Sequence, residues 1–159
     1  RADVLGLRQA VCRRTGRQRP VSGLCYRFQV PGDDYYRAGE ASSTVKNRLK
    51  RLGVSPEAIR RVSIALYEGE INMVIHGGGG EVTVTVSPDR VDMILEDHGK
   101  GIPDIEKAMQ EGYSTASEEA RSLGFGAGMG LPNMKKYTDT MQIESTVGVG
   151  TTVRMTVLL

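Results

Sequence analysis

A long, mainly apolar helical pattern over residues 55–77 limits the fold more than any other feature of the chain. Ser55 and Pro56 are residue types that favour a helix N-cap and the first helical position. Apolar residues then cover more than half of the helix circumference. Because such a helix must bury most of its surface, we expect it to lie against a sheet.

Three polar residues nevertheless recur on this helix at intervals of four: Glu68, Asn72 and His76. On a helix, residues four apart lie about 6 Å apart on nearly the same face. The stripe is either a solvent-facing edge or one wall of a site. The second interpretation has a chemical basis, because a carboxylate can accept a proton and an amide oxygen can ligate a hard cation such as Mg²⁺.

The remaining sequence predicts strands and further helices. Alternating residues indicate a first strand over 25–30, and helical spacing indicates a helix over 38–53. Two hairpins are predicted, over 81–97 and 141–159, with short helices over 103–112 and 131–139. Residues 113–130 are polar, rich in glycine and too weakly patterned to belong to a core. This order predicts an α/β (α+β) two-layer sandwich without a second domain.

Composition narrows the possible functions. The 159-residue chain has the length of one domain, and no apolar run approaches the roughly 20 residues needed to cross a bilayer. Cys12 and Cys25 match neither a disulfide framework nor a metal motif. We therefore expect a cytoplasmic protein with no membrane partner.

Charge is distributed unevenly along the chain. The net charge is +2, but residues 1–24 hold six arginines against one aspartate, which leaves residues 25–159 with a net charge of −3. An arginine-rich terminus of this kind is more often disordered than bound to nucleic acid. We expect a disordered leader over residues 1–24, a folded domain over residues 25–159 and no nucleic-acid partner.

A second polar cluster lies in "LEDHGKGIPD", where an apolar strand ends in Asp97 and is followed by Gly99, Gly101 and Ile102. Glycine at these places lets the backbone approach a flat ligand closely. An ionised aspartate only accepts hydrogen bonds, so it would attract the amino edge of adenine and repel the carbonyl of guanine. The alternative is a plain turn between a strand and a helix.

The third cluster is the segment "LGFGAGMGLPNMKK", with glycine at positions 124, 126, 128 and 130. Backbone N–H groups in such a loop suit phosphate oxygens. The segment is not a Walker loop, and it lacks the context of a dinucleotide fingerprint. Taken alone, it is more typical of a flexible linker.

The order of these clusters is E-x-x-x-N-x-x-x-H, D-x-G-x-G-I, G-x-G-x-G-x-G and then "GVGTTV" near the end of the chain. It resembles the GHKL ATPase superfamily, whose nucleotide site is the Bergerat fold. Within that superfamily, "GYSTASEE…LGFGAGMGLPNMKKYTD" is especially similar to the small bacterial anti-sigma-factor serine/threonine kinases and switch kinases. The resemblance covers about residues 25–159. It implies a mixed, mostly antiparallel sheet with helices on one face.

The resemblance also implies a role for each cluster. Glu68 would be the general base, and Asn72 would hold the Mg²⁺ that bridges the phosphates of ATP. Asp97 would bind the adenine amino group, and residues 104–125 would form a mobile lid. The remaining nucleotide-binding residues would be Gly99, Gly101, Ile102, Gly124, Gly126, Gly128, Met129, Gly130, Leu131 and Thr151. His76 would have a structural or site-lining role and no catalytic one.

No lysine lies within the glycine loop itself. Charge compensation for the phosphates would then come from Mg²⁺, from backbone amides and from Lys100, Lys135 or Arg121. Gly69 and Glu70 lie between Glu68 and Asn72 on the helix. A glycine at position 69 would destabilise the helix relative to alanine, unless it permits close packing.

The resemblance implies a kinase that transfers the γ-phosphoryl group of Mg-ATP to a serine or threonine of a small STAS-type antagonist. Such kinases commonly form homodimers that also bind a sigma factor. One alternative is a nucleotide-gated binding module with little turnover. Another is the catalytic half of a split histidine kinase, which would need its phospho-accepting histidine from a separate chain.

Overall fold

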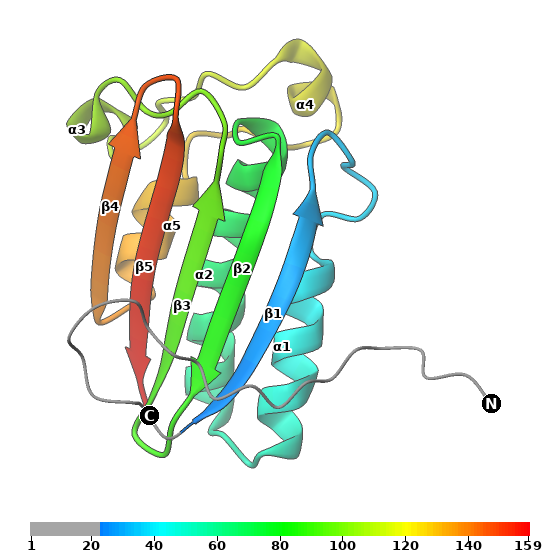
Figure 1. The fold of residues 1–159 in the computed structure, drawn as a ribbon, viewed down its shortest axis with the longest axis vertical. Helices are drawn as coiled ribbons and strands as arrows, with labels where there is room; N and C mark the ends of the chain where they lie inside the picture. The colour runs from blue at the N-terminus through cyan, green and yellow to red at the C-terminus, as the bar shows by residue number, and fades with distance from the viewer. Residues whose placement is uncertain (1–22) are drawn as a thin grey trace.

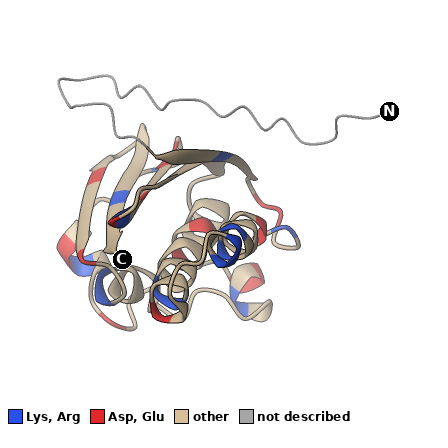
Figure 2. Cartoon of the chain, turned by 90° about the horizontal axis from the view of Figure 1, so that it is seen from below, with Lys and Arg blue, Asp and Glu red and all other residues tan. Residues whose placement is uncertain are grey.

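A computed structural model describes residues 23–159, which form one antiparallel sheet with helices on one face (Figure 1). The expected leader falls almost wholly outside the described residues, and Leu24 already belongs to the first strand. Cys12 also lies outside them. Figure 2 shows the two layers, with the sheet above and the helices below.

The sheet has five strands in the order β1-β2-β3-β5-β4. Their bounds are Leu24–Pro31 (β1), Gly79–Val86 (β2), Arg90–Asp97 (β3), Thr140–Thr146 (β4) and Gly150–Leu158 (β5). Every pairing is antiparallel. The expectation of a mixed, mostly antiparallel sheet is therefore corrected to a wholly antiparallel one, because both predicted hairpins pair directly and β5 inserts between β3 and β4.

Alternation along the strands gives the sheet one apolar and one polar face. In β2, Val82 and Val84 are fully buried, and in β3, Met93 and Leu95 join the same core. Apart from Ile94, the intervening positions of β2 and β3 are threonines and charged residues, which is the pattern of an antiparallel sheet with one more polar face. The apolar face therefore accepts the helices.

The central helix is α2 (Pro56–Ile75), whose N-cap Ser55 accepts a hydrogen bond from the N–H of Ala58. It lies against the apolar face of the sheet, between α1 (Glu40–Arg51) and α5 (Gly130–Lys136). Val62 and Leu66 are fully buried in the resulting core. The predicted contact between a largely buried helix and a sheet is confirmed.

Two short helices, α3 (Ile105–Ala108) and α4 (Glu118–Ser122), lie beyond one end of the sheet (Figure 1). α4 was not expected from the sequence; Ala120 within it and Ala116 just before it are buried. As the sequence predicts, no residue of 113–130 belongs to the main hydrophobic core, although these two alanines are buried locally. No helix among residues 23–159 is long and apolar enough to cross a membrane.

Candidate functional site

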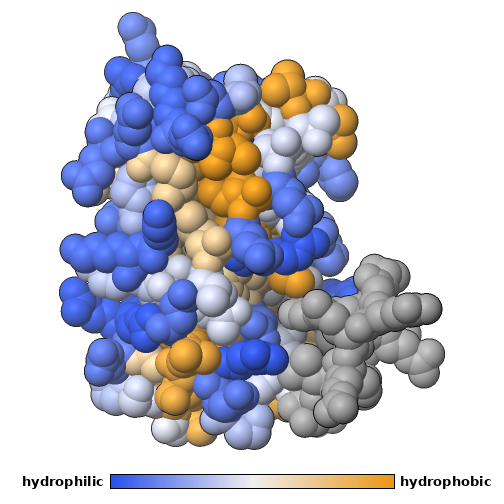
Figure 3. Space-filling model, turned by 90° about the vertical axis from the view of Figure 1, so that its left-hand side faces the viewer, coloured by the Kyte–Doolittle hydropathy of each residue, from blue (hydrophilic) through white to orange (hydrophobic). Residues whose placement is uncertain are grey.

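A cavity of about 1040 Å³ lies between α2, the adjoining ends of β3 and β5, and the segment that carries α3 and α4. Sites for drug-sized ligands commonly enclose about 300–1,000 Å³, so this space is large enough for a nucleotide. Val147 of the β4–β5 turn lines the cavity and is 63% exposed, so the cavity reaches solvent there. Figure 3 shows apolar side chains exposed on the side of the molecule that carries β4.

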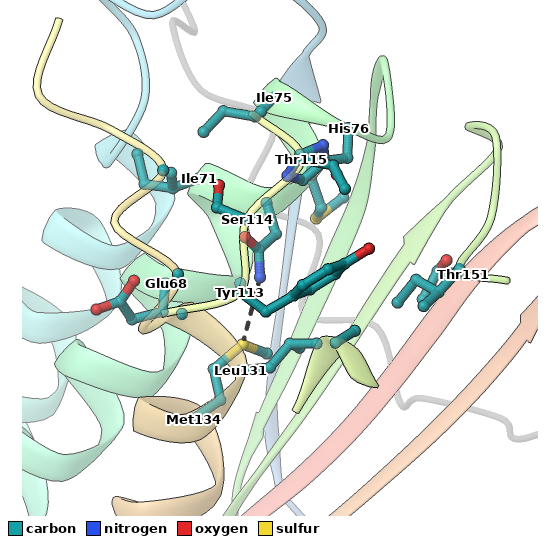
Figure 4. Close-up of a pocket in the computed structure, with 18 of the residues that line it drawn as sticks. Glu68, Ile71, Ile75, His76, Tyr113, Ser114, Thr115, Leu131, Met134 and Thr151 are labelled. Atoms are coloured by element: carbon teal, nitrogen blue, oxygen red, sulfur yellow. Dashed lines mark hydrogen bonds between the residues drawn. The ribbon is translucent and has the colours of Figure 1, made fainter. Parts of the chain in front are cut away.

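All three polar residues of the α2 stripe line this cavity. A Cβ atom added to Gly130 would lie 3.2 Å from both terminal atoms of Asn72 and 3.5 Å from Glu68 Oε2. The start of α5 therefore approaches the carboxylate and the amide at once. Asn72 also donates a weak hydrogen bond to the sulfur of Met134 at 3.8 Å, drawn as the dashed line in Figure 4.

The end of β3 places Asp97 at another part of the cavity wall. Its Oδ1 accepts hydrogen bonds from the N–H of Gly99 at 2.9 Å and of Thr151 at 3.2 Å. These two donors fix the carboxylate and leave Oδ2 with no recorded donor among residues 23–159. In Figure 4, Glu68 and Thr151 lie on opposite sides of the view, with Tyr113 and Leu131 between them.

Gly77 explains how the end of α2 can meet Asp97. A Cβ atom at Gly77 would come within 2.6 Å of Asp97 Cβ and Cγ, and within 2.9 Å of Oδ2. Only a residue without a side chain leaves this space. The glycine run after α2 is visible in the sequence, and its contact with Asp97 follows from the pairing of β2 with β3, which sets Gly80 opposite Asp97.

The glycine segment borders the same cavity. Gly124, Gly126 and Gly128 adopt positive φ angles of 88°, 80° and 75°, a conformation that other residues rarely adopt. At Gly128 a side chain would also strike the backbone of Gly112. The segment therefore adopts defined glycine-dependent turns along the cavity wall.

The structure brings together nearly all residues that the sequence singled out. Asp97, Gly101, Ile102, Gly124, Gly126, Gly128, Met129, Gly130, Leu131 and Thr151 line the main cavity together with Glu68 and Asn72. Gly99 is the exception, because it lines a smaller neighbouring cavity of about 480 Å³ and reaches the site only through its hydrogen bond to Asp97.

Two lysines, Lys100 and Lys107, line the cavity. Neither Lys135 nor Arg121 does, and the Arg121 guanidinium instead donates to the carbonyl of Ser114 at 3.4 Å. Burial, reinforced by Lys100, lowers the pKa of His76 despite the opposing effect of Asp97. These surroundings therefore favour the neutral imidazole of His76.

Several contacts at the site could not be found in the sequence. Asn133 of α5 donates to Glu68 Oε1 at 2.9 Å. Tyr35, in the loop after β1, stacks on Phe125 with ring centroids 5.9 Å apart, which joins the glycine segment to the core. The residues in each pair are 65 and 90 positions apart, and no local pattern links them.

Within residues 23–159, no group of three or more His, Cys, Asp or Glu side chains could hold a metal ion unaided. Mg²⁺ is commonly held by one or two carboxylates together with substrate phosphates, and in protein kinases an asparagine also serves as a ligand. The amide oxygen of Asn72, facing a cavity of nucleotide size, fits that mode of binding.

Known proteins are similar to this chain in sequence. Residues 33–157 match the histidine kinase-like ATPase domain family. The chain is 39% identical over 105 residues to an anti-sigma F factor of Thermoanaerobacter sp. strain X514, covering 63% of this chain and 70% of that protein. It is 33% identical over 113 residues to the serine/threonine-protein kinase RsbT of Bacillus subtilis strain 168, covering 69% and 79% respectively.

The fold itself also has a solved counterpart. A chain in the crystal structure of the SiaB-SiaC complex from Pseudomonas aeruginosa superposes with a TM-score of 0.51 at 10% sequence identity. The match covers 84% of this chain and 89% of that one. At this level of identity the comparison shows a common fold.

Proposed function

Because the chain belongs to the histidine kinase-like ATPase domain family, we propose that it is an ATP-dependent protein serine/threonine kinase of the anti-sigma-factor type. It binds Mg-ATP and transfers the γ-phosphoryl group to a serine or threonine of a small regulatory partner. The observation that carries the proposal is one cavity lined by the strand-end carboxylate Asp97 and by the Glu68–Asn72 pair on α2. Relatives named anti-sigma F factor and serine/threonine-protein kinase support it.

Asp97 binds the adenine in this proposal. Its Oδ1 is occupied by the N–H groups of Gly99 and Thr151, so Oδ2 accepts from the exocyclic amine of the base. Thr151 assists through its hydroxyl, which shares a hydrogen bond of 2.8 Å with the hydroxyl of Ser145. Gly101 lies beside the base on the cavity wall; its φ of 75° and the backbone of Thr146, which a Cβ would strike, both require glycine there.

The phosphates lie toward Asn72 and the glycine segment. Asn72 would hold Mg²⁺, and the bound ion would neutralise phosphate charge, as in other phosphoryl-transfer enzymes. Backbone N–H groups of residues 126–130 bind phosphate oxygens. Lys100 and Lys107 are the lysines that line the cavity, so they supply the positive charge that the loop itself lacks.

Glu68 is the proposed general base. It lies one helical turn from Asn72 on the same face of α2 and lines the cavity. A carboxylate there can orient the attacking serine or threonine hydroxyl and accept its proton. The hydroxyl oxygen then bonds to the γ-phosphorus as the bond to the ADP oxygen breaks.

The partner is proposed to be a small STAS-type antagonist or a sigma factor, and the kinase to act as a homodimer. The sigma factor is suggested by the relatives named anti-sigma F factor in Thermoanaerobacter and Bacillus subtilis, whereas the STAS-type antagonist and the homodimer are what the resemblance to the anti-sigma-factor kinases implies. A cytoplasmic location, where ATP and Mg²⁺ are available, belongs to the same proposal. It involves neither membrane nor nucleic-acid binding.

A nucleotide-gated switch is the second candidate, favoured by the lid. Residues 104–125 carry α3 and α4, and the Tyr35–Phe125 stack joins the end of this segment to the core. Closure of such a segment over ATP could hold a partner without turnover.

Phosphoryl transfer distinguishes the two functions. Wild-type protein is incubated with radiolabelled Mg-[γ-³²P]ATP and purified STAS-domain proteins from the same genome, beside Glu68→Gln and the matched control Glu57→Gln, an exposed position on the same helix. A kinase labels a STAS protein on serine or threonine in wild type and control, and Glu68→Gln loses most of the label. ATP binding without label in any of them would refute the kinase and favour the switch.

A further inference from the structure

The hydrogen bond between Asn133 and Glu68 joins the proposed general base to another helix of the site. Asn133 Nδ2 donates to Glu68 Oε1 at 2.9 Å, from α5 to α2. Among residues 23–159 no other hydrogen bond to the Glu68 carboxylate is recorded. The second oxygen, Oε2, faces the start of α5, 3.5 Å from the position of a Cβ on Gly130.

We propose that Asn133 is a positioning residue for phosphoryl transfer, which holds one carboxylate oxygen of Glu68 so that the other faces the reacting hydroxyl. This inference rests on the proposed function, because it takes Glu68 to be the general base. Asn133 itself does not line the cavity, so it acts through Glu68 and not on the substrate.

The chemistry favours an amide for this task. A glutamate side chain has several rotatable bonds and loses conformational freedom when it is held in one place. A neutral amide donor fixes the carboxylate at one oxygen without neutralising it, whereas a lysine would compete for the negative charge that makes the base effective. The free oxygen keeps its lone pairs for the proton.

The position of Asn133 also explains how the donor is held. Its backbone N–H bonds to the carbonyl of Met129 at 2.9 Å, within the turn that follows the glycine segment. The next residue, Met134, is fully buried in the core and fixes the rotation of α5. The side-chain amide is thus held by α5, which packs against the core and directly follows the segment that is proposed to bind phosphates.

A purely structural role is the alternative, in which the bond only ties α2 to α5. Such a role predicts weaker ATP binding and a lower melting temperature when Asn133 changes, because α5 begins at Gly130. The positioning role predicts slower turnover with ATP affinity almost unchanged. The two roles therefore differ in how kcat and KM respond.

The test compares wild type, Asn133→Leu, Asn133→Asp and the control Lys136→Gln, an exposed position on the same helix. Each is measured for single-turnover conversion of Mg-[γ-³²P]ATP with the STAS-domain probes, for ATP affinity and for melting temperature. General base catalysis contributes about 100- to 10,000-fold, so loss of positioning is expected to slow turnover about 10- to 100-fold. ATP affinity should stay within about threefold, and the control should match wild type.

A nuclear magnetic resonance measurement checks the contact itself. The side-chain amide signals of Asn133, identified by their absence in Asn133→Leu, should shift in Glu68→Gln and not in Glu57→Gln. Equal turnover in wild type and Asn133→Leu would overturn the positioning role alone. A wild-type protein that converts no ATP would overturn the proposed function, and the assignment of Asn133 with it.

Discussion

The buried carboxylate of Glu70 allows a stability prediction that can be worked out from its contacts. Glu70 is 2% exposed and lies two residues after Glu68, on a different face of α2. Its Oε1 accepts from the N–H groups of Gly39 at 3.0 Å and Ala41 at 3.1 Å, and its Oε2 accepts from the N–H of Ser42 at 3.0 Å.

These three donors belong to the N-terminus of α1, where the N-cap Gly39 offers no side chain of its own. Glu70 therefore caps α1 from α2. A buried donor left unpaired costs about 1–3 kcal/mol, so Glu70→Ala should lower the free energy of unfolding by at least about 3 kcal/mol. Glu70→Gln keeps one oxygen but turns an NH₂ group toward a backbone donor, and should cost about 1–3 kcal/mol.

Urea denaturation followed by far-UV circular dichroism measures both losses. The control is Glu40→Gln, which removes a pair with Arg37 at 3.0 Å in which the glutamate side chain is 60% exposed. Exposed pairs of this kind contribute at most about 1 kcal/mol. A loss below about 1 kcal/mol for Glu70→Ala would refute the view that this carboxylate holds α1 on α2.

Two further changes test packing and charge. Gly69→Ala would place a methyl group against Leu95. We expect the cost of overpacking, about 1–3 kcal/mol, to exceed the gain in helix propensity, roughly 1 kcal/mol, so the free energy of unfolding should fall. An increase in the free energy of unfolding would contradict this. The backbone N–H of Leu158 and the Arg61 side chain lower the pKa of Asp139. The resulting stability is present above the unfolded pKa of about 3.9 and is lost as pH falls toward the folded pKa. In Asp139→Asn the free energy of unfolding should therefore fall less steeply below pH 4 than in wild type. The same pH dependence in both proteins would contradict this.

The sequence predicted those parts of the fold that depend on neighbours along the chain. The Ser55–Pro56 start and the apolar circumference of α2 are local, and so are the two hairpins. The stripe of Glu68 and Asn72 was visible for the same reason, because helical periodicity alone places both on one face.

The parts that were missed depend on pairing between distant segments. The insertion of β5 between β3 and β4 cannot be deduced from the pattern of either strand. α4 has only five residues, so it is stabilised by its Ser117 cap and by the burial of Ala120 rather than by periodicity. Glu70 looked like a polar residue at an unexplained position, because its three donors lie about 30 residues earlier in the chain.

The most direct test of the proposed site is the calorimetric affinity for ATP, with and without Mg²⁺, of wild type, Asp97→Asn and Asn72→Ala. Asp89→Asn, in the exposed turn at the other end of β3, is the control. If Asp97 binds the adenine and Asn72 the metal, Asp97→Asn should weaken binding about 10-fold or more in both conditions, as expected for a lost hydrogen bond to a charged group. Asn72→Ala should weaken binding only when Mg²⁺ is present. Binding of Asp97→Asn as tight as that of wild type would contradict the account.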